Sequence, residues 1–330
     1  MNKGNMNSVD IFEKNKRIGR GINLGNALEF EEKDWDGGQL YTWIIKEEDI
    51  DRIKNAGFDS LRIPVKWSGH ALKEAPYTIN KIFFNRVDEV VNYALSKGFT
   101  VILDVHHYNE MNLAPYEHIE RLETIWKQLS EHYQGYPHPL YFEILNEPDD
   151  KNLTSSVWNS FISRILPVIR EKNPDRAVVI GPPLWHHHKY LNELQLPEED
   201  RNIIVGIHNY DPFEFTHQGA YWIPGIGTDK KEWEGTDSEK AFLREGLDTI
   251  STWGEEHRRP MYIGEFGCIQ LADEISRAKY LSFITKEMQV RGIPWTYWDY
   301  CADFRVFDKE KGEWITSILD ALTGKSNWNY

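Results

Sequence analysis

Cysteine is nearly absent from this chain of 330 residues, which contains only Cys268 and Cys301. Two cysteines can form at most one bridge, so the disulfide framework of a small secreted domain is excluded, and two free buried thiols are the favoured expectation. The sequence also lacks an apolar run of about 18 residues, the length needed to cross a membrane as a helix. We therefore expect no membrane insertion.

Positive charge is scarce as well, with 38 Lys and Arg against 52 Asp and Glu, and a formal net charge of −14. This balance argues against nucleic-acid binding, which needs Lys and Arg clustered on one face, and is compatible with an uncharged ligand. Residues 1–10 lack the apolar segment of a secretory signal. A cytoplasmic protein is expected if this start is native, and a secreted one if a leader has been removed.

Several catalytic motifs are missing, among them the Walker phosphate loop, the Gly-x-Ser-x-Gly elbow and the His-Glu-x-x-His zinc helix. The segment 19–25 resembles a dinucleotide fingerprint, but three residues rather than two separate its last two glycines. Histidines cluster at His106-His107 and at 186–188, yet consecutive side chains of an extended strand point to opposite sides and do not converge on one ion. A metal site is the minority interpretation, and no cofactor is expected.

Aromatic residues, by contrast, are plentiful, with 13 Trp, 16 Tyr and 15 Phe. Flat aromatic faces suit pyranose rings, although core packing is the simpler interpretation for any one of them. No Ser-, Gly- or Pro-rich tract and no single-sign charge tract divides the sequence. We therefore expect one domain over residues 1–330, with a polar N-terminal extension over 1–16, and a monomer.

Short apolar or β-branched runs alternate with helical patterns along the chain, which is typical of parallel βα units. The expected strands cover 18–24, 60–65, 100–105, 140–145, 177–180, 203–207, 261–264 and 294–298. Glycines such as Gly57, Gly98 and Gly292 end the intervening helices. Eight strands favour a closed α/β barrel, the (β/α)8 TIM barrel, over an open sheet, and the long gap 210–259 predicts a loop on the catalytic face.

Two glutamates follow expected strands. Glu147, in Asn146-Glu147-Pro148, comes after the run 140–145, and Glu265 comes after 261–264. Because the carboxyl ends of parallel barrel strands meet on one face, these carboxylates are expected to lie close together. A facing pair of carboxylates is the minimum apparatus for cleaving a glycosidic bond.

Seven short segments, each at an expected strand end, carry a resemblance to a known family. They are 21–26 (Gly-Ile-Asn-Leu-Gly-Asn), 61–64 (Leu-Arg-Ile-Pro), 105–108 (Val-His-His-Tyr), 146–148 (Asn-Glu-Pro), 208–210 (His-Asn-Tyr), 263–267 (Ile-Gly-Glu-Phe-Gly) and 297–298 (Tyr-Trp). In this order they resemble glycoside hydrolase family 5, the (β/α)8 family of cellulases and mannanases. Segments 27–29 and 212–219 look most like bacterial cellulases of the thermophile type, some of which also cleave mannan.

The resemblance implies a retaining mechanism in which Glu147 is the acid/base and Glu265 the nucleophile, with carboxyl groups about 5–5.5 Å apart. The pKa of Glu147 would be raised. Arg62 would hydrogen-bond Glu265 and keep it ionised. Further roles are implied for Asn146 at the sugar 2-hydroxyl, His208 and Tyr210 as polar support, Trp298 as stacking floor, His106 and His107 beside the same sugar, and Asn26 and Glu29 at the neighbouring sugar.

The long loop is expected to add His217 and Trp222 to the sugar contacts, with packing or surface roles as alternatives. Asn209 stands where the family pattern has an aromatic residue, which bears on sugar specificity and not on the chemistry. The implied activity is an endo-β-1,4-glucanase acting on a β-linked polysaccharide or oligosaccharide, with mannan or glucomannan as further substrates. Alternatives are an intracellular gluco- or manno-oligosaccharide hydrolase or transglycosylase, an endo-β-1,4-mannanase, and a non-catalytic sugar-binding barrel.

Overall fold

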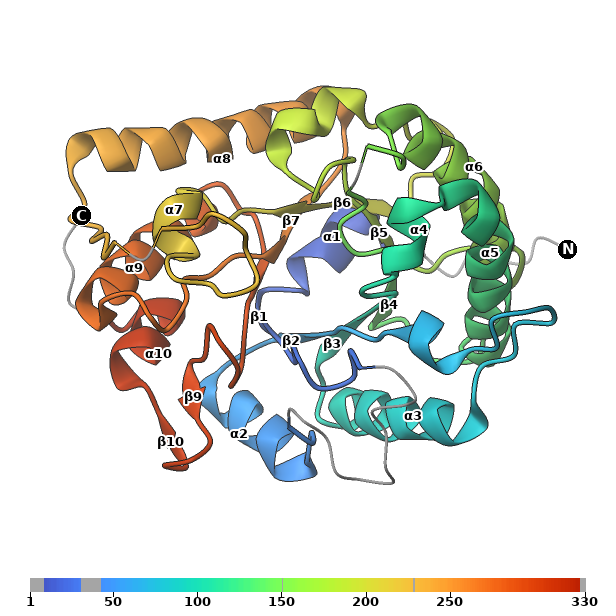
Figure 1. Ribbon diagram of the computed structural model, residues 1–330, viewed down its shortest axis with the longest axis horizontal. Helices are drawn as coiled ribbons and strands as arrows, with labels where there is room; N and C mark the ends of the chain where they lie inside the picture. Colours follow the sequence, from blue (N-terminus) through green and yellow to red (C-terminus); the bar gives the residue numbers. More distant parts are fainter. Residues whose placement is uncertain (1–8, 31–42, 150, 228, 327–330) are drawn as a thin grey trace, which may run out of the picture.

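Eight parallel strands close into a barrel in chain order in the computed structural model, which describes residues 9–30, 43–149, 151–227 and 229–326 (Figure 1). The strands are β1 (Arg20–Asn23), β2 (Ser60–Ile63), β3 (Thr100–Asp104), β4 (Leu140–Glu143), β5 (Val178–Ile180), β6 (Ile203–His208), β7 (Met261–Glu265) and β8 (Trp295–Tyr297). The expected (β/α)8 barrel is confirmed. Each observed strand overlaps the run that predicted it.

Helices surround the barrel as an outer ring, with α8, α9 and α10 on one side and α5 and α6 on the other (Figure 1). They are α2 (Glu47–Ala56), α3 (Lys81–Ser96), α4 (Asn109–Leu113), α5 (Pro115–His132), α6 (Ser155–Lys172), α7 (Phe213–Thr216), α8 (Asp237–His257), α9 (Glu274–Val290) and α10 (Thr316–Thr323), with 310 helices η2 (Trp67–His70) and η3 (His188–Glu193) and the hairpin β9 (Phe307–Asp308) and β10 (Glu313–Trp314). Between β5 and β6 the described connection is η3, where the sequence pattern predicts an α-helix.

Alternate residues of each strand point into the barrel, and this period of two determines where polar side chains gather. Near the start of the strands the interior is apolar, with Ile102, Tyr141 and Tyr262 buried together. Two residues further along β3 and β4 the same inward positions are Asp104 and Glu143, which are register partners. The barrel interior is therefore polar at the carboxyl ends of the strands and apolar nearer their amino ends.

The opposite end of the barrel is closed by α1 (Ile11–Lys16), which lies within the expected polar extension 1–16. Ile11 packs into the apolar cluster of the barrel interior, and Asn15 Nδ2 donates to the carbonyl oxygen of Met261 at 2.9 Å. Residues 11–16 are thus an integral part of the barrel. Residues 1–8 lie outside the described residues.

Both cysteines are free thiols, as expected, but Cys301 is only partly buried while Cys268 is fully buried. Burial raises the pKa of the Cys268 thiol to about 12, so this thiol stays protonated and unreactive at neutral pH. Within the described residues, no helix has the length and apolarity required to cross a membrane.

Candidate active site

A fully buried arginine, Arg62 on β2, lies in the polar layer at the carboxyl ends of the strands. Its guanidinium binds Glu143 with two hydrogen bonds, from Nε at 2.8 Å and from Nη2 at 2.7 Å. Nη1 donates to Glu265 at 2.7 Å, and Nη2 lies 2.6 Å from a carboxylate oxygen of Asp104. One permanent cation is therefore shared among three buried carboxylates, an arrangement suited to the rigid fork of arginine.

Glu265 is the last residue of β7, and both of its carboxylate oxygens accept hydrogen bonds. Arg62 donates to Oε1, and the Tyr210 hydroxyl donates to Oε2 at 2.9 Å. Tyr210 follows β6, the strand that pairs with β7. Donors on both oxygens favour the ionised form of a carboxyl group.

Glu147 lies in the turn after β4, with a backbone φ of 42°, a region that non-glycine residues rarely adopt. Its side chain is 27% exposed, against 6% for Glu265, so it stands at the rim of the site. Oε1 of Glu147 is 2.6 Å from Nδ1 of His208, the last residue of β6. This carboxyl group thus has a neutral-ring partner where Glu265 has a cationic one.

The two glutamates face each other, since a carboxylate oxygen of each lies within 4.8 Å of the other and of a His208 nitrogen. Burial raises the pKa of Glu147 to about 7 against the opposing charges of Arg62 and His107. Burial also raises the pKa of Glu265 to about 7, although His208 and Arg62 act to lower it. The expected Arg62 bond is present, but burial outweighs its effect on the pKa of Glu265. Because Glu265 accepts from two donors, we expect the last proton of the pair to reside on Glu147.

The raised pKa of Glu147 predicts a stability difference that depends on pH. Between about pH 4.5 and 7 the folded protein keeps a proton that the unfolded chain has lost, so the free energy of unfolding falls as pH rises. Glu147→Gln removes this cost and is expected to be more stable than the wild type by about 3 kcal/mol at pH 8. Denaturant titrations of both proteins at pH 8 and pH 4 measure this difference in the free energy of unfolding. An equal stabilisation at pH 4 would contradict the raised pKa of Glu147.

Glu29, after β1, forms a second polar group with two of the candidate sugar-binding residues. Its Oε1 accepts from the backbone N–H of Asn26 at 2.6 Å, and its Oε2 lies 3.1 Å from Nε2 of His107. Burial would raise the pKa of Glu29, but the neighbouring histidines outweigh it and the pKa is lowered. The His107 side chain is 47% exposed and reaches the surface of the site.

His106 and Trp298 stack on each other at the barrel mouth, with ring centroids 5.6 Å apart and an angle of 9° between the planes. His106 is buried, and its Nδ1 lies 2.9 Å from Asp104. His106 therefore lies against the Trp298 ring and supports it, and its contact with a sugar stays a prediction. Gly25 leaves room for Trp298, because an added Cβ would lie 2.9 Å from the indole.

The long loop after β6 carries two predicted sugar-binding residues, His217 and Trp222, which differ in exposure. His217 is buried, and its ring stacks on that of Phe213. The rings of His217 and Tyr210 meet edge-on, with their centroids 4.7 Å apart, so His217 packs against Tyr210. Trp222 is 42% exposed, and its contact with a sugar stays a prediction. The side chain of Asn209 is buried and accepts a hydrogen bond from the backbone N–H of Asp211, which stabilises the turn.

Four residues of the site were missed from the sequence. Asn23, Asp104 and Glu143 are buried inward-facing residues of β1, β3 and β4, and a polar residue at an inward position of an apolar strand is a usable signal. Trp185, after β5, is 51% exposed, and its Nε1 donates to Asp149 at 2.9 Å.

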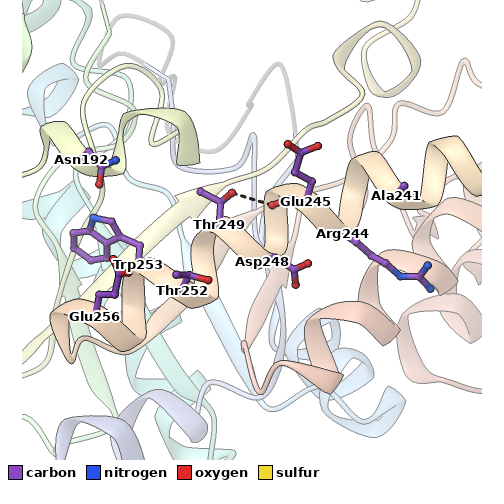
Figure 2. Close-up of a pocket in the computed structure, with 9 residues that line it drawn as sticks. All are labelled: Asn192, Ala241, Arg244, Glu245, Asp248, Thr249, Thr252, Trp253 and Glu256. Atoms are coloured by element: carbon purple, nitrogen blue, oxygen red, sulfur yellow. Dashed lines mark hydrogen bonds between the residues drawn. The ribbon is translucent and has the colours of Figure 1, made fainter.

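A surface groove of about 650 Å³ lies elsewhere, along α8 and beside η3 (Figure 2). Two of its charged residues are paired: Arg244 with Glu287 of α9, and Asp248 with Arg291, the residue that caps the carboxyl end of α9. Trp253 forms part of its wall and is itself buried. The groove lies on the outer ring of helices, away from the strand ends that carry the facing glutamates, and is therefore not the catalytic centre.

The comparison with known proteins agrees with this geometry. Residues 21–304 match the model of the family described as Cellulase (glycosyl hydrolase family 5). Endoglucanase H of Acetivibrio thermocellus is 35% identical over 96% of this chain and 34% of its own length, and Cellulase/esterase CelE of the same organism is 30% identical over 89% of the chain and 37% of its length. The chain thus spans about a third of the length of these two relatives.

Solved structures match the whole barrel. Endoglucanase Cel5A from the hyperthermophilic Thermotoga maritima is 44% identical with a TM-score of 0.90, over 95% of this chain and 100% of that one. Cel5A in complex with mannotriose matches over the same shares at 43% identity and 0.90, and Cel5A in complex with cellobiose at 44% and 0.90. With its closed barrel, its facing glutamates and a family match over residues 21–304, this chain belongs to glycosyl hydrolase family 5.

Proposed function

We propose that this protein is a retaining endo-β-1,4-glucanase. The observation that carries the proposal is the spacing of Glu147 and Glu265, whose nearest carboxylate oxygens lie within 4.8 Å. Retaining glycosidases hold their carboxyl groups about 5–5.5 Å apart, whereas inverting enzymes need about 6.5–9.5 Å to admit a water molecule. The short spacing supports direct attack by one carboxylate.

The partners of each glutamate support its role. Glu147, which retains the proton, protonates the leaving glycosidic oxygen as the ionised Glu265 attacks the anomeric carbon and forms a covalent glycosyl-enzyme. Glu147, now ionised, then removes a proton from water, and the hydroxide displaces Glu265. Arg62 and Tyr210 hold the two oxygens of Glu265 and so direct it at the anomeric carbon.

The sugar at the cleavage point would lie on Trp298, within reach of Asn146. The carbonyl oxygen of Asn146 is committed to Arg62 Nη2 at 2.8 Å, which leaves its amide N–H groups to donate to the 2-hydroxyl. Glu29, Asn26 and His107 would bind the neighbouring sugar on the side of β1 to β3. Asn26 itself has a φ of 57° in this turn.

The leaving-group side would be formed by Trp185. It follows β5, on the side of Glu147 away from β1 and β2, and its backbone N–H donates to the carbonyl oxygen of Pro148 at 3.2 Å. Together with the side-chain bond to Asp149, this fixes an exposed indole beside the acid. Trp222 would contact sugars from the long loop.

Glucan is the main proposed substrate, because relatives named endoglucanases match most of the chain. Mannan or glucomannan is the second, supported by the mannotriose complex of Cel5A. The test is an activity panel on soluble β-glucan, glucomannan, mannan and short cello-oligosaccharides, with anomeric analysis of the first product by NMR. A β-configured first product and mid-chain cleavage are expected. An α-configured first product would refute retention, and release of disaccharides alone would refute endo action.

A further inference from the structure

His186 is a fully buried histidine beside His208, the partner of Glu147, and its contacts do not explain why a polar residue occupies this position. Its ring packs edge-on against His208, with centroids 4.9 Å apart and an angle of 75° between the planes. Within the described part of the chain, neither ring nitrogen has a hydrogen-bond partner. A buried unpaired polar group costs about 1–3 kcal/mol, so an apolar residue would be the more stable choice if packing alone mattered.

The backbone that carries His186 is itself unusual. Leu184, Trp185 and His186 have φ values of 56°, 60° and 53°, three consecutive non-glycine residues in the left-handed region. The carbonyl oxygen of His186 accepts a hydrogen bond from the backbone N–H of His208 at 3.0 Å. The ring also needs Gly181, where an added Cβ would lie 2.3 Å from it. The local fold is thus built to hold this imidazole against His208.

The position of the proton on His208 matters for the acid. In a neutral imidazole one ring nitrogen donates and the other accepts. With Nδ1 of His208 2.6 Å from Glu147, a hydrogen on Nε2 makes Nδ1 an acceptor, and the bond then requires a protonated Glu147. A hydrogen on Nδ1 instead favours an ionised Glu147. The tautomer of His208 is fixed by whatever accepts from Nε2.

We propose that His186 is a positioning residue that accepts a hydrogen bond from Nε2 of His208 and so keeps the proton on Glu147 until the leaving group takes it. Glu143, His186 and His208 each bring one nitrogen or oxygen within 4.8 Å of the others, and the proposed bond forms when the rings of His186 and His208 approach from this distance. Both oxygens of Glu143 already accept from Arg62, whereas neither ring nitrogen of His186 has a hydrogen-bond partner among the described residues. The inference rests on the proposed acid role of Glu147.

The charged groups that face His186 and His208 do not make either ring cationic. Glu265 on β7, Glu143 on β4 and Asp104 on β3 face His208 and favour its protonation, while Arg62 on β2 opposes it. Burial, the largest influence, lowers the pKa of His208. His186 faces His208, Arg62 and His106, and burial lowers its pKa well below the usual range. Both rings are therefore neutral at neutral pH, and only the tautomer remains to be set.

The test is the pH profile of kcat/KM for His186→Ala on a cello-oligosaccharide, whose alcohol leaving group needs the proton of Glu147. Without its acceptor, His208 can carry the hydrogen on Nδ1 and donate to ionised Glu147, which lowers the pKa of the acid. The limb on the alkaline side is expected to move to lower pH by about one unit, so kcat/KM falls about tenfold at pH 8 and little at pH 5. His186→Gln, which retains an acceptor, is expected to restore the limb.

His188→Ala is the matched control, because His188 lies on the same segment, is also buried and has a ring nitrogen without a hydrogen-bond partner among the described residues, but contacts α8 at Gly246. It is expected to leave the limb in place. An unmoved alkaline limb in folded His186→Ala, or an equal loss of kcat/KM at every pH, would overturn the proposal.

If the alanine variant does not fold, ¹⁵N NMR of His208 in the wild type decides. A hydrogen on Nδ1 at pH values below the alkaline limb would overturn the proposal. Inactivity of the wild type on all β-glycans would refute the proposed function instead.

Discussion

Glu265→Ala is expected to lower kcat/KM on soluble β-glucan by roughly 10⁴–10⁶-fold, the range seen when an enzyme loses the residue that forms its covalent intermediate. The variant lacks the carboxylate that attacks the anomeric carbon, but Arg62 and Tyr210 remain. Azide can enter the space left by the side chain and attack from the same face. Added azide is therefore expected to restore turnover of an activated aryl glycoside and to yield the α-glycosyl azide.

Glu147→Ala separates the two roles. An acid is dispensable when the leaving group needs no proton, so this variant is expected to form the glycosyl-enzyme at near wild-type rate from a dinitrophenyl glycoside and to fail on natural polymer. Glu198→Ala, at a residue whose side chain is 89% exposed, serves as the control and should retain full activity. A β-glycosyl azide from Glu147→Ala and an α-glycosyl azide from Glu265→Ala fit the assignment. The reverse pattern would exchange the roles.

Arg62→Met is expected to lower the free energy of unfolding by about 3–5 kcal/mol, because removal of one partner of a buried ion pair leaves uncompensated charge. Here the loss leaves three carboxylates without their shared cation. Methionine fills much of the same space, so the effect reports charge more than packing. Activity should be abolished as well, since Glu265 would lose its orienting donor. Denaturant unfolding followed by tryptophan fluorescence measures the stability.

Arg164→Met provides the comparison. Arg164 pairs with Glu123 on the surface, with side chains 50% and 34% exposed, and such pairs contribute about 0–1 kcal/mol. A loss below 1 kcal/mol in Arg62→Met, similar to that in Arg164→Met, would show that the polar layer is not held by this cation. Loss of activity with unchanged stability would point to a purely catalytic role for Arg62.

The barrel could be predicted from the sequence because parallel strands buried on both faces appear as short apolar runs, and glycine marks the helix ends. Gly57, with a φ of 96°, occupies a left-handed helix cap as expected. The facing glutamates could be predicted because each directly follows such a run. Both inferences depend on local patterns and on the rule that parallel strand ends share one face.

The rest depends on which side chains meet across strands. The pairing of Arg62 with Glu143 and Asp104 requires the register of β2, β3 and β4, which the sequence does not specify. His106 and His107 are adjacent and identical in type, yet one is buried against the Trp298 ring and the other reaches the surface. The left-handed turn that places His186 uses no glycine, and so it has no recognisable sequence signal.

The helix α1 also bears on how the enzyme can be presented to an insoluble polymer. It closes the barrel at the end opposite the facing glutamates, where Lys14 Nζ donates to the carbonyl oxygen of Asp175 ahead of β5. A tether or a second module attached ahead of α1 would therefore leave from the back of the molecule. The barrel end that carries the facing glutamates would then point outward, free to approach a fibre or an immobilised glucan, and immobilisation through an N-terminal tag should preserve access where random surface coupling blocks it.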